Sequence, residues 1–247
     1  MNNIGLTTEK SMINYINEKK YLRNMNDNIK KFLSSIFDFD VLNHEIKACK
    51  FADNYKPDII ITANNVSKYI SLKTGNSNSI HQEHLYSFIE FLRNFNISNK
   101  AIKTLKYFQF NDKTLDGSGK QRRDANDYIK NHQQEIYELN LFFNNNTVKE
   151  ALIKKLLFEG EYFHIPSVDY IYYGDIEYGL WASKTEITNY LKSINLFSSS
   201  IHTSKLYYQS LHRNLKFDKY YEYRRYYIQF KWYSIKEDLK YILEKRK

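Results

Sequence analysis

The stretch that decides the fold is KPDIIITANNVSKYISLKTGNSNSIHQE, residues 56–83. Its β-branched run DIIIT predicts a short strand, and KYISLK alternates in polarity as a second strand does. The letters ANN between them are typical of a tight turn. The stretch therefore predicts a β-hairpin, in which Asp58 opens one strand and Lys73 closes the other, so that both residues lie at the same end of a sheet.

Outside the hairpin, apolar spacing predicts a chain of mixed α/β class. Three- and four-residue spacings predict two helices over 7–35 and further helices at 41–50, 80–95, 128–143, 148–158, 184–194 and from 234 onward. Runs rich in tyrosine, isoleucine and tryptophan predict strands at 170–173, 179–182 and 226–232.

These elements suggest three regions along the chain. We expect a helical N-terminal segment over 1–35, a core over 36–145 and an α/β region over 146–247 that contacts the substrate. No Pro- or Ser-rich linker separates the regions, so a single compact unit is the alternative. With 42% hydrophobic residues, the chain has enough apolar material for a core in either case.

The charge balance points to a polyanionic partner. The chain carries 37 Lys and Arg against 28 Asp and Glu, a formal net charge of +9. Nucleic acid and an anionic membrane surface both fit such a surplus. A coding sequence rich in A and T is a further explanation, because it favours lysine along with asparagine, isoleucine and tyrosine.

The single cysteine and the hydropathy pattern bear on location. Cys49, which we expect to be a buried filler, excludes an internal disulfide and a CxxC zinc site. No apolar run approaches the ~20 residues that span a bilayer, and the N-terminus has no apolar signal region. We expect a soluble cytoplasmic protein without a membrane partner.

The candidate chemistry lies at the end of the hairpin. We expect Glu83, in the first turn of the following helix, to bring a second carboxylate towards Asp58 and Lys73. Two carboxylates bind a hard cation such as Mg²⁺, and a lysine beside them can orient water or stabilise charge on a phosphate. That set suits phosphodiester hydrolysis. A solvated helix face is the competing interpretation of Glu83, and His81 is expected to be a core histidine.

The same residues resemble the signature of the PD-(D/E)xK nuclease superfamily, which has the restriction-endonuclease-like fold. Lys56-Pro57-Asp58 matches the Pro-Asp that begins a strand. Ser71-Leu72-Lys73 places serine where the family usually has an acidic residue, so the chain is similar to the variant in which that carboxylate has moved to the following helix, here as Glu83. The resemblance covers about residues 45–95.

The resemblance implies a central mixed β-sheet flanked by helices and Mg²⁺-dependent cleavage of DNA, in a type II restriction or other defence role. It assigns Asp58, Lys73 and Glu83 to catalysis and Asp58 and Glu83 to metal binding. Glu45, on the helix expected over 41–50, would be the first-helix glutamate that assists the metal. Duplex cutters are often dimers, so a homodimer is consistent with the resemblance.

Basic residues elsewhere are candidates for holding DNA. They lie in a Gly-bearing loop and in a tyrosine-rich C-terminal stretch: Lys120, Arg122, Arg123, Arg213, Asn214, Arg224, Arg225 and Lys231. Phosphate contacts and base stacking would use such residues, whereas exposed loops and core aromatics are the ordinary alternative. The leading hypothesis is an endonuclease acting on double-stranded DNA. Its rivals are a catalytically degenerate nucleic-acid-binding protein and a protein-interaction or structural component.

Overall fold

The computed structural model describes residues 4–53, 55–75, 78–119, 125–161, 166–196, 198–211 and 219–246, and it confirms the predicted α/β class. The chain divides into two compact units. The first comprises Met1–Asn78, Leu157–Tyr190 and Ser234–Lys247, and the second comprises Ser79–Leu156 and Leu191–Tyr233. These breaks differ from the boundaries expected near residues 36 and 146.

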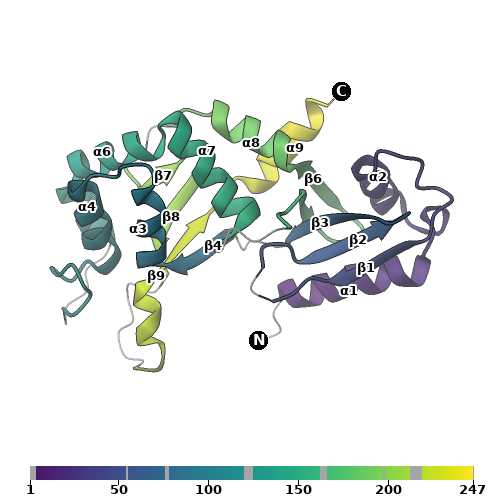
Figure 1. Cartoon of the computed structure of the whole chain (residues 1–247), viewed down its shortest axis with the longest axis horizontal. Coiled ribbons are helices and arrows are strands. Elements are labelled where there is room, and N and C mark those ends of the chain that lie inside the picture. Colours follow the sequence, from purple (N-terminus) through teal and green to yellow (C-terminus); the bar gives the residue numbers. More distant parts are fainter. Residues whose placement is uncertain are drawn as a thin grey trace. The chain divides into compact units, whose positions relative to one another are not determined.

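The first unit contains a mixed sheet (Figure 1). Its strands, in spatial order, are β1 (Ile46–Lys50), β2 (Ile59–Ala63), β3 (Val66–Lys73), β5 (Tyr170–Gly174) and β6 (Gly179–Ser183). Only the β3–β5 pair is parallel. The predicted hairpin is confirmed as β2–β3. Asn64 and Asn65 have φ values of 47° and 61°, the left-handed conformation that a two-residue hairpin turn requires.

Helices cover this sheet on the side of its main apolar core. They are α1 (Ile4–Lys19), the 3₁₀ turn η1 (Leu22–Asn24) and α2 (Asp27–Ile36). The predicted pair of helices over 7–35 is therefore confirmed. Met12 and Ile16 of α1 and Phe32 of α2 are fully buried, and the Phe32 ring lies 4.8 Å from that of Tyr172 and 5.4 Å from that of Trp181. Helix α9 (Ile235–Glu244) contacts β6.

Helix α1 lies along β1, and this packing sets which end of the helix approaches the hairpin's charged end (Figure 1). The Asn17 amide donates to the Ala48 carbonyl and accepts from the Ala48 N–H, each at 2.8 Å. Beyond the helix C-terminus, the Ile46 N–H donates to the Lys20 carbonyl at 2.7 Å. The C-terminus of α1 therefore lies at the start of β1, and its N-terminus lies near the end of β1.

The helix predicted over 41–50 is wrong, because residues 46–50 form strand β1. Ile46 and Ala48 are buried while their neighbours are exposed, which is the two-residue period of a strand with one face on the core. Cys49 is on the exposed side, so the expectation of a buried cysteine is also wrong.

The second unit contains an antiparallel sheet. Its strands, in spatial order, are β4 (Ser79–His84), β9 (Tyr227–Lys231), β8 (Leu206–Ser210) and β7 (His202–Thr203). Its helices are α3 (Leu85–Arg93), α4 (Asn99–Phe110), α5 (Ala125–Asn131), α6 (Gln133–Phe143) and α7 (Asn146–Lys154), which continues into the π-helical turn Lys155–Glu159. The rings of Phe88, Phe143, Tyr208 and Phe230 form its aromatic core.

The helix predicted over 80–95 begins later than expected, since residues 79–84 form β4 and α3 starts at Leu85. Strand β4 pairs with β9, which confirms the strand predicted at 226–232. Helix α8 (Lys184–Ser193) confirms the one predicted at 184–194. None of the helices in the described ranges has both the length and the apolar character needed to cross a bilayer.

Candidate functional site

The hairpin brings Asp58 and Lys73 together at one end of the first unit's sheet. The Lys73 Nζ lies 3.7 Å from Oδ2 of Asp58, and the two side chains are 19% and 25% exposed. The Ser71 hydroxyl donates to the same Oδ2 at 2.9 Å, and the Leu72 N–H donates to it at 2.6 Å. All three contacts are made to Oδ2, so they fix the carboxylate without using Oδ1, and the pair stays partly exposed.

Ser71 therefore has a definite place in the site. It stands where the resemblance expects an acidic residue, and it is 1% exposed. Its hydroxyl supports Asp58 instead of offering a second carboxylate. The site needs a carboxylate from elsewhere if it is to hold a metal as the resemblance implies.

A second carboxylate, which the sequence analysis missed, comes from α1. Burial raises the pKa of Glu9 above its usual value, and the negative charge of Asp58 raises it further, while the positive charges of Lys50 and Lys73 act in the opposite direction. Glu9 thus lies within electrostatic reach of the hairpin's charged end, as expected from the N-terminus of α1. A signal was present in the sequence, since Glu9 precedes the buried Met12 and Ile16 by three and seven residues, which places all three on one helix face.

Glu45 lies at the opposite end of β1 from Asp58. It directly precedes Ile46, whereas the Asp58 carbonyl accepts from the N–H of Phe51, just beyond the other end of that strand. Its carboxylate pairs with Lys47 at 3.3 Å and Lys20 at 3.7 Å. The structure does not bring Glu45 to the Asp58–Lys73 pair. Glu45 directly precedes strand β1, whereas the resemblance implied a position on a helix.

Glu83 lies in strand β4 of the second unit, so the expected position in the first turn of a helix is wrong, and so is the competing interpretation of a solvated helix face. Its side chain is fully buried. One carboxylate oxygen lies 2.9 Å from Nε2 of His81 and the other 3.1 Å from Nζ of Lys155, whose side chain is 1% exposed. The Lys155 ammonium also lies 5.0 Å from the centre of the Phe91 ring. His81 is 6% exposed, which agrees with a core histidine.

The donor set at the hairpin end suits a magnesium ion. Within the described ranges, no three His, Cys, Asp or Glu side chains form a ready metal cluster. Mg²⁺ needs fewer protein ligands than that, because it keeps several waters and binds through one or two carboxylates together with substrate phosphates. Asp58 and Glu9 are near enough for their negative charges to oppose each other, and a bound cation would relieve this repulsion.

The predicted DNA-binding residues fall into two groups. Lys120, Arg122, Arg123, Arg213 and Asn214 lie outside the described residues. The remaining three lie in the second unit beside tyrosines. The guanidinium of Arg224 is 5.9 Å from the Tyr223 ring, that of Arg225 is 5.4 Å from the Tyr226 ring, and the ammonium of Lys231 is 5.8 Å from the Tyr233 ring. Arg225 also donates to the Gly117 carbonyl.

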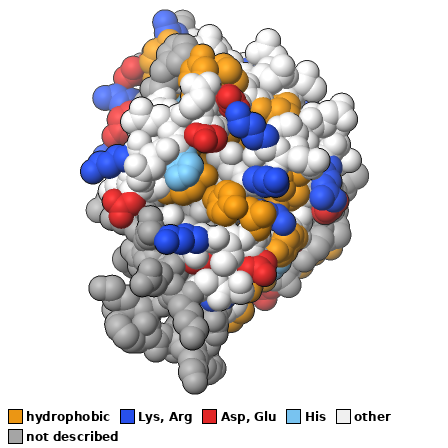
Figure 2. Space-filling view, turned by 90° about the vertical axis from the view of Figure 1, so that its left-hand side faces the viewer, with side chains coloured by type: hydrophobic (Ala, Val, Ile, Leu, Met, Phe, Trp, Pro, Cys, Tyr) orange, Lys and Arg blue, Asp and Glu red, His pale blue; other side chains and the backbone are white. Residues whose placement is uncertain are grey.

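Basic and aromatic side chains also mix on the face of the second unit that includes α4 and α6. Figure 2 shows hydrophobic side chains near the centre of this face, with Lys, Arg, Asp and Glu side chains around them. On α4, the ammonium of Lys106 lies 5.0 Å from the ring of Tyr86, which is 38% exposed. Such a surface combines charge for phosphates with rings for bases.

Comparison with known proteins adds no family. The chain matches no protein-family model, and a search of curated proteins gives no match.

Proposed function

We propose that this protein is a metal-dependent endonuclease that hydrolyses phosphodiester bonds of double-stranded DNA, in a restriction or other defence role. The observation that carries the proposal is the Lys73–Asp58 pair, 3.7 Å apart and partly exposed at the end of the predicted hairpin. A cytoplasmic location, expected from the single cysteine, belongs to the same proposal.

The residues at this end of the sheet would have different roles in the reaction. Asp58, held by Ser71 and the Leu72 N–H, and Glu9 would hold Mg²⁺. When bound, the ion would supply positive charge to the scissile phosphate and make a bound water more acidic. Lys73 places its ammonium beside Asp58, where it can orient the attacking water or offset negative charge that develops on the phosphate.

The test is plasmid cleavage by the purified protein with Mg²⁺ and then with EDTA. Asp58→Ala and Lys73→Ala should each lower the rate by at least about a hundredfold, because each removes a charged group at the reacting phosphate. Asp38→Ala and Lys47→Ala are the matched controls, since their side chains are 99% and 70% exposed, and they should cleave normally. Cleavage that survives EDTA, or that tolerates both site variants, would overturn the proposal.

A second experiment identifies the second carboxylate. Glu9 shares the electrostatic surroundings of Asp58, whereas Glu83, the carboxylate that the resemblance assigns to the metal, is buried with Lys155 in the second unit. We expect Glu9→Gln to lose cleavage without losing stability, and Glu83→Gln to lose stability first. Loss of cleavage in a stably folded Glu83→Gln protein would instead favour the migrated arrangement.

The rival without catalysis has a distinct outcome. If Ser71 marks a degenerate site, the protein should bind duplex DNA with an affinity that falls steeply with salt, yet leave plasmid intact at every Mg²⁺ concentration. If the protein neither binds nor cleaves DNA, its positive net charge is explained by a coding sequence rich in A and T.

A further inference from the structure

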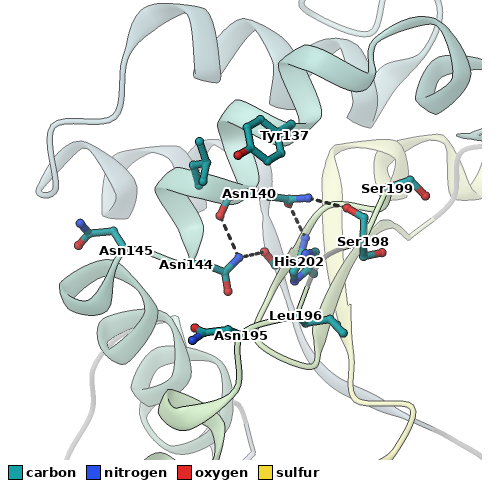
Figure 3. A pocket seen from close by; sticks show the side chains of 10 residues that line it. Tyr137, Asn140, Asn144, Asn145, Asn195, Leu196, Ser198, Ser199 and His202 are labelled. Carbon is teal, nitrogen blue, oxygen red and sulfur yellow. Dashed lines mark hydrogen bonds between the residues drawn. The ribbon is translucent and has the colours of Figure 1, made fainter.

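The second unit contains a cavity of 680 Å³ that none of the predicted site residues lines. It lies between α6, the start of α7 and the segment that leads into β7 (Figure 3). The lining side chains are those of Tyr137, Asn140, Leu141, Asn144, Asn145, Asn195, Leu196, Ser198, Ser199 and His202. Its volume falls within the range of small-molecule sites, roughly 300–1,000 Å³.

Two asparagines one helical turn apart build the wall of this cavity. The Asn140 amide donates to the carbonyls of Ser198 and Ser200 at 3.2 and 2.9 Å, and its oxygen accepts from the His202 N–H at 3.0 Å. The Asn144 amide donates to the His202 carbonyl at 3.1 Å, and its oxygen accepts from the Ser204 N–H at 2.8 Å. Since β7 is an edge strand, these amides satisfy backbone groups that would otherwise face outward.

A buried lysine fixes the other wall. Lys149 is 1% exposed, and its ammonium donates to the carbonyls of Lys192 and Ile194 and to Oδ1 of Asn195 at 3.1–3.3 Å. Burial lowers the pKa of Lys149. The contacts hold the segment before β7 in place, and because Oδ1 of Asn195 accepts from Lys149, the amide nitrogen is the end that can donate to a ligand.

The lining combines polar groups with a larger share of apolar surface, and it carries no formal charge among its described residues. His202 is 1% exposed, and its Nδ1 lies 3.0 Å from the Ser204 carbonyl, which can only accept. Nδ1 therefore carries the proton, and Nε2 is an acceptor. Burial, which is the main cause, lowers the pKa of His202 and keeps the ring neutral. Amides, hydroxyls and a neutral imidazole favour a ligand without net charge.

Two large apolar side chains at the rim of the cavity are about half exposed to solvent. Tyr137 is 49% exposed, and Leu141, one turn further along α6, is 55% exposed. Figure 3 shows Tyr137 on the helix side and Ser198 and Leu196 on the facing segment. A flat ligand stacked on the ring of Tyr137 would cover part of this exposed apolar surface.

We propose that this cavity binds a nucleobase, by stacking on Tyr137 and by hydrogen bonds to the Asn195 amide and neighbouring hydroxyls. Nucleobases are flat and neutral, they stack on tyrosine, and asparagine amides read their edges. The choice of a base over other neutral ligands rests on the proposed nuclease function. The base can come from a free nucleoside or from a nucleotide turned out of a DNA strand, and both present the same chemistry.

The test uses 2-aminopurine, whose fluorescence falls when it stacks. Two probes are titrated with the intact chain: 2-aminopurine deoxyriboside, and a duplex with 2-aminopurine opposite an abasic site. We expect saturable quenching of at least one probe, and competition by natural deoxynucleosides. Tyr137→Ala should weaken binding between about fivefold and a hundredfold, as loss of one stacking ring does. Asn195→Ala should weaken it less and change the order of preference among bases.

Tyr241→Ala is the matched control, since Tyr241 is 48% exposed and lies in the other unit. Quenching by the duplex alone assigns the cavity to a base within DNA, and quenching by the nucleoside assigns it to a free ligand. Quenching of neither probe, competition by glucose but not by nucleosides, or equal effects of Tyr137→Ala and Tyr241→Ala would overturn the inference. The same titration with Asp58→Ala protein separates the proposals, because base binding should persist there whether or not the wild type cleaves DNA.

Discussion

Two acid–lysine pairs in this chain have the same chemistry and opposite surroundings. In the first unit, Lys73 and Asp58 are 3.7 Å apart and 19% and 25% exposed. In the second, Lys155 and Glu83 are 3.1 Å apart and essentially without exposure. A substrate can reach only a pair that retains contact with solvent, whereas a fully buried pair is mainly a constraint on the fold. Burial, and not the distance between the charges, separates the two roles.

The largest expected effect comes from breaking the buried pair. Glu83→Ala leaves the Lys155 ammonium in the core without its carboxylate, which should lower the free energy of unfolding by about 3–5 kcal/mol. Chemical denaturation with urea measures it. The double variant Glu83→Leu with Lys155→Met should recover most of this loss, since apolar residues of similar volume replace buried pairs well. If the Glu83→Ala protein is as stable as the wild type, the buried Glu83–Lys155 pair does not stabilise the fold.

The second prediction sharpens the role of the exposed pair. Ser71→Ala removes the hydroxyl that supports Asp58 while leaving every charge in place. Loss of such a supporting contact typically costs about ten- to a hundredfold in metal affinity or activity. Stability should fall by only about 1 kcal/mol, because one hydrogen bond is lost.

Ser67→Ala is the matched control, since the Ser67 hydroxyl lies 2.9 Å from that of Thr62 in the same hairpin but is exposed. Mg²⁺ titration of cleavage rates compares the two variants. Equal rates for Ser71→Ala and Ser67→Ala would show that Asp58 does not need this support.

The third prediction concerns pH. The folded protein raises the pKa of Glu9, so the folded state binds its proton more tightly than the unfolded state does. Stability from this group is therefore present at low pH and is lost as pH rises through the raised pKa. Glu9→Gln should make the protein slightly more stable at neutral pH, by well under about 1 kcal/mol, and flatten the pH dependence of Tm above pH 4.5. Added Mg²⁺ should stabilise the wild type more than the variant. A less stable Glu9→Gln protein would contradict this.

The smallest effect is expected at an exposed pair. Lys100 lies 2.6 Å from Glu138, closer than either pair above, yet the side chains are 63% and 41% exposed. The contact lowers the pKa of Glu138, so its contribution is present at neutral pH and is lost as the pH falls. Lys100→Ala should leave Tm unchanged within the error of calorimetry. A large drop would show that distance matters more than burial.

The hairpin was predictable because its information is local. The turn residues, the alternation and the Pro-Asp start all lie within one short stretch, so Asp58 and Lys73 were placed together correctly. Strand β4 was not recognised because its partner β9 lies far along the chain, and the apolar positions after it belong to a helix. The position of Glu9 near Asp58 could not be predicted without knowing that α1 packs on β1. The cavity could not be predicted from the sequence, because Asn140 and Asn144 contact the backbone at β7, a segment that lies about 60 residues further along the chain.

The order of the segments also affects the chain during its synthesis. The first unit is built from three separate stretches, and its strand β3 finds the parallel partner β5 only after the intervening second-unit segment has been made. Until then the edge of β3 is open on the ribosome, and pairing across such a sequence separation is slow. We therefore expect nascent chains that stop before Tyr170 to present an unsatisfied strand edge, and this edge is where chaperone binding or aggregation would begin.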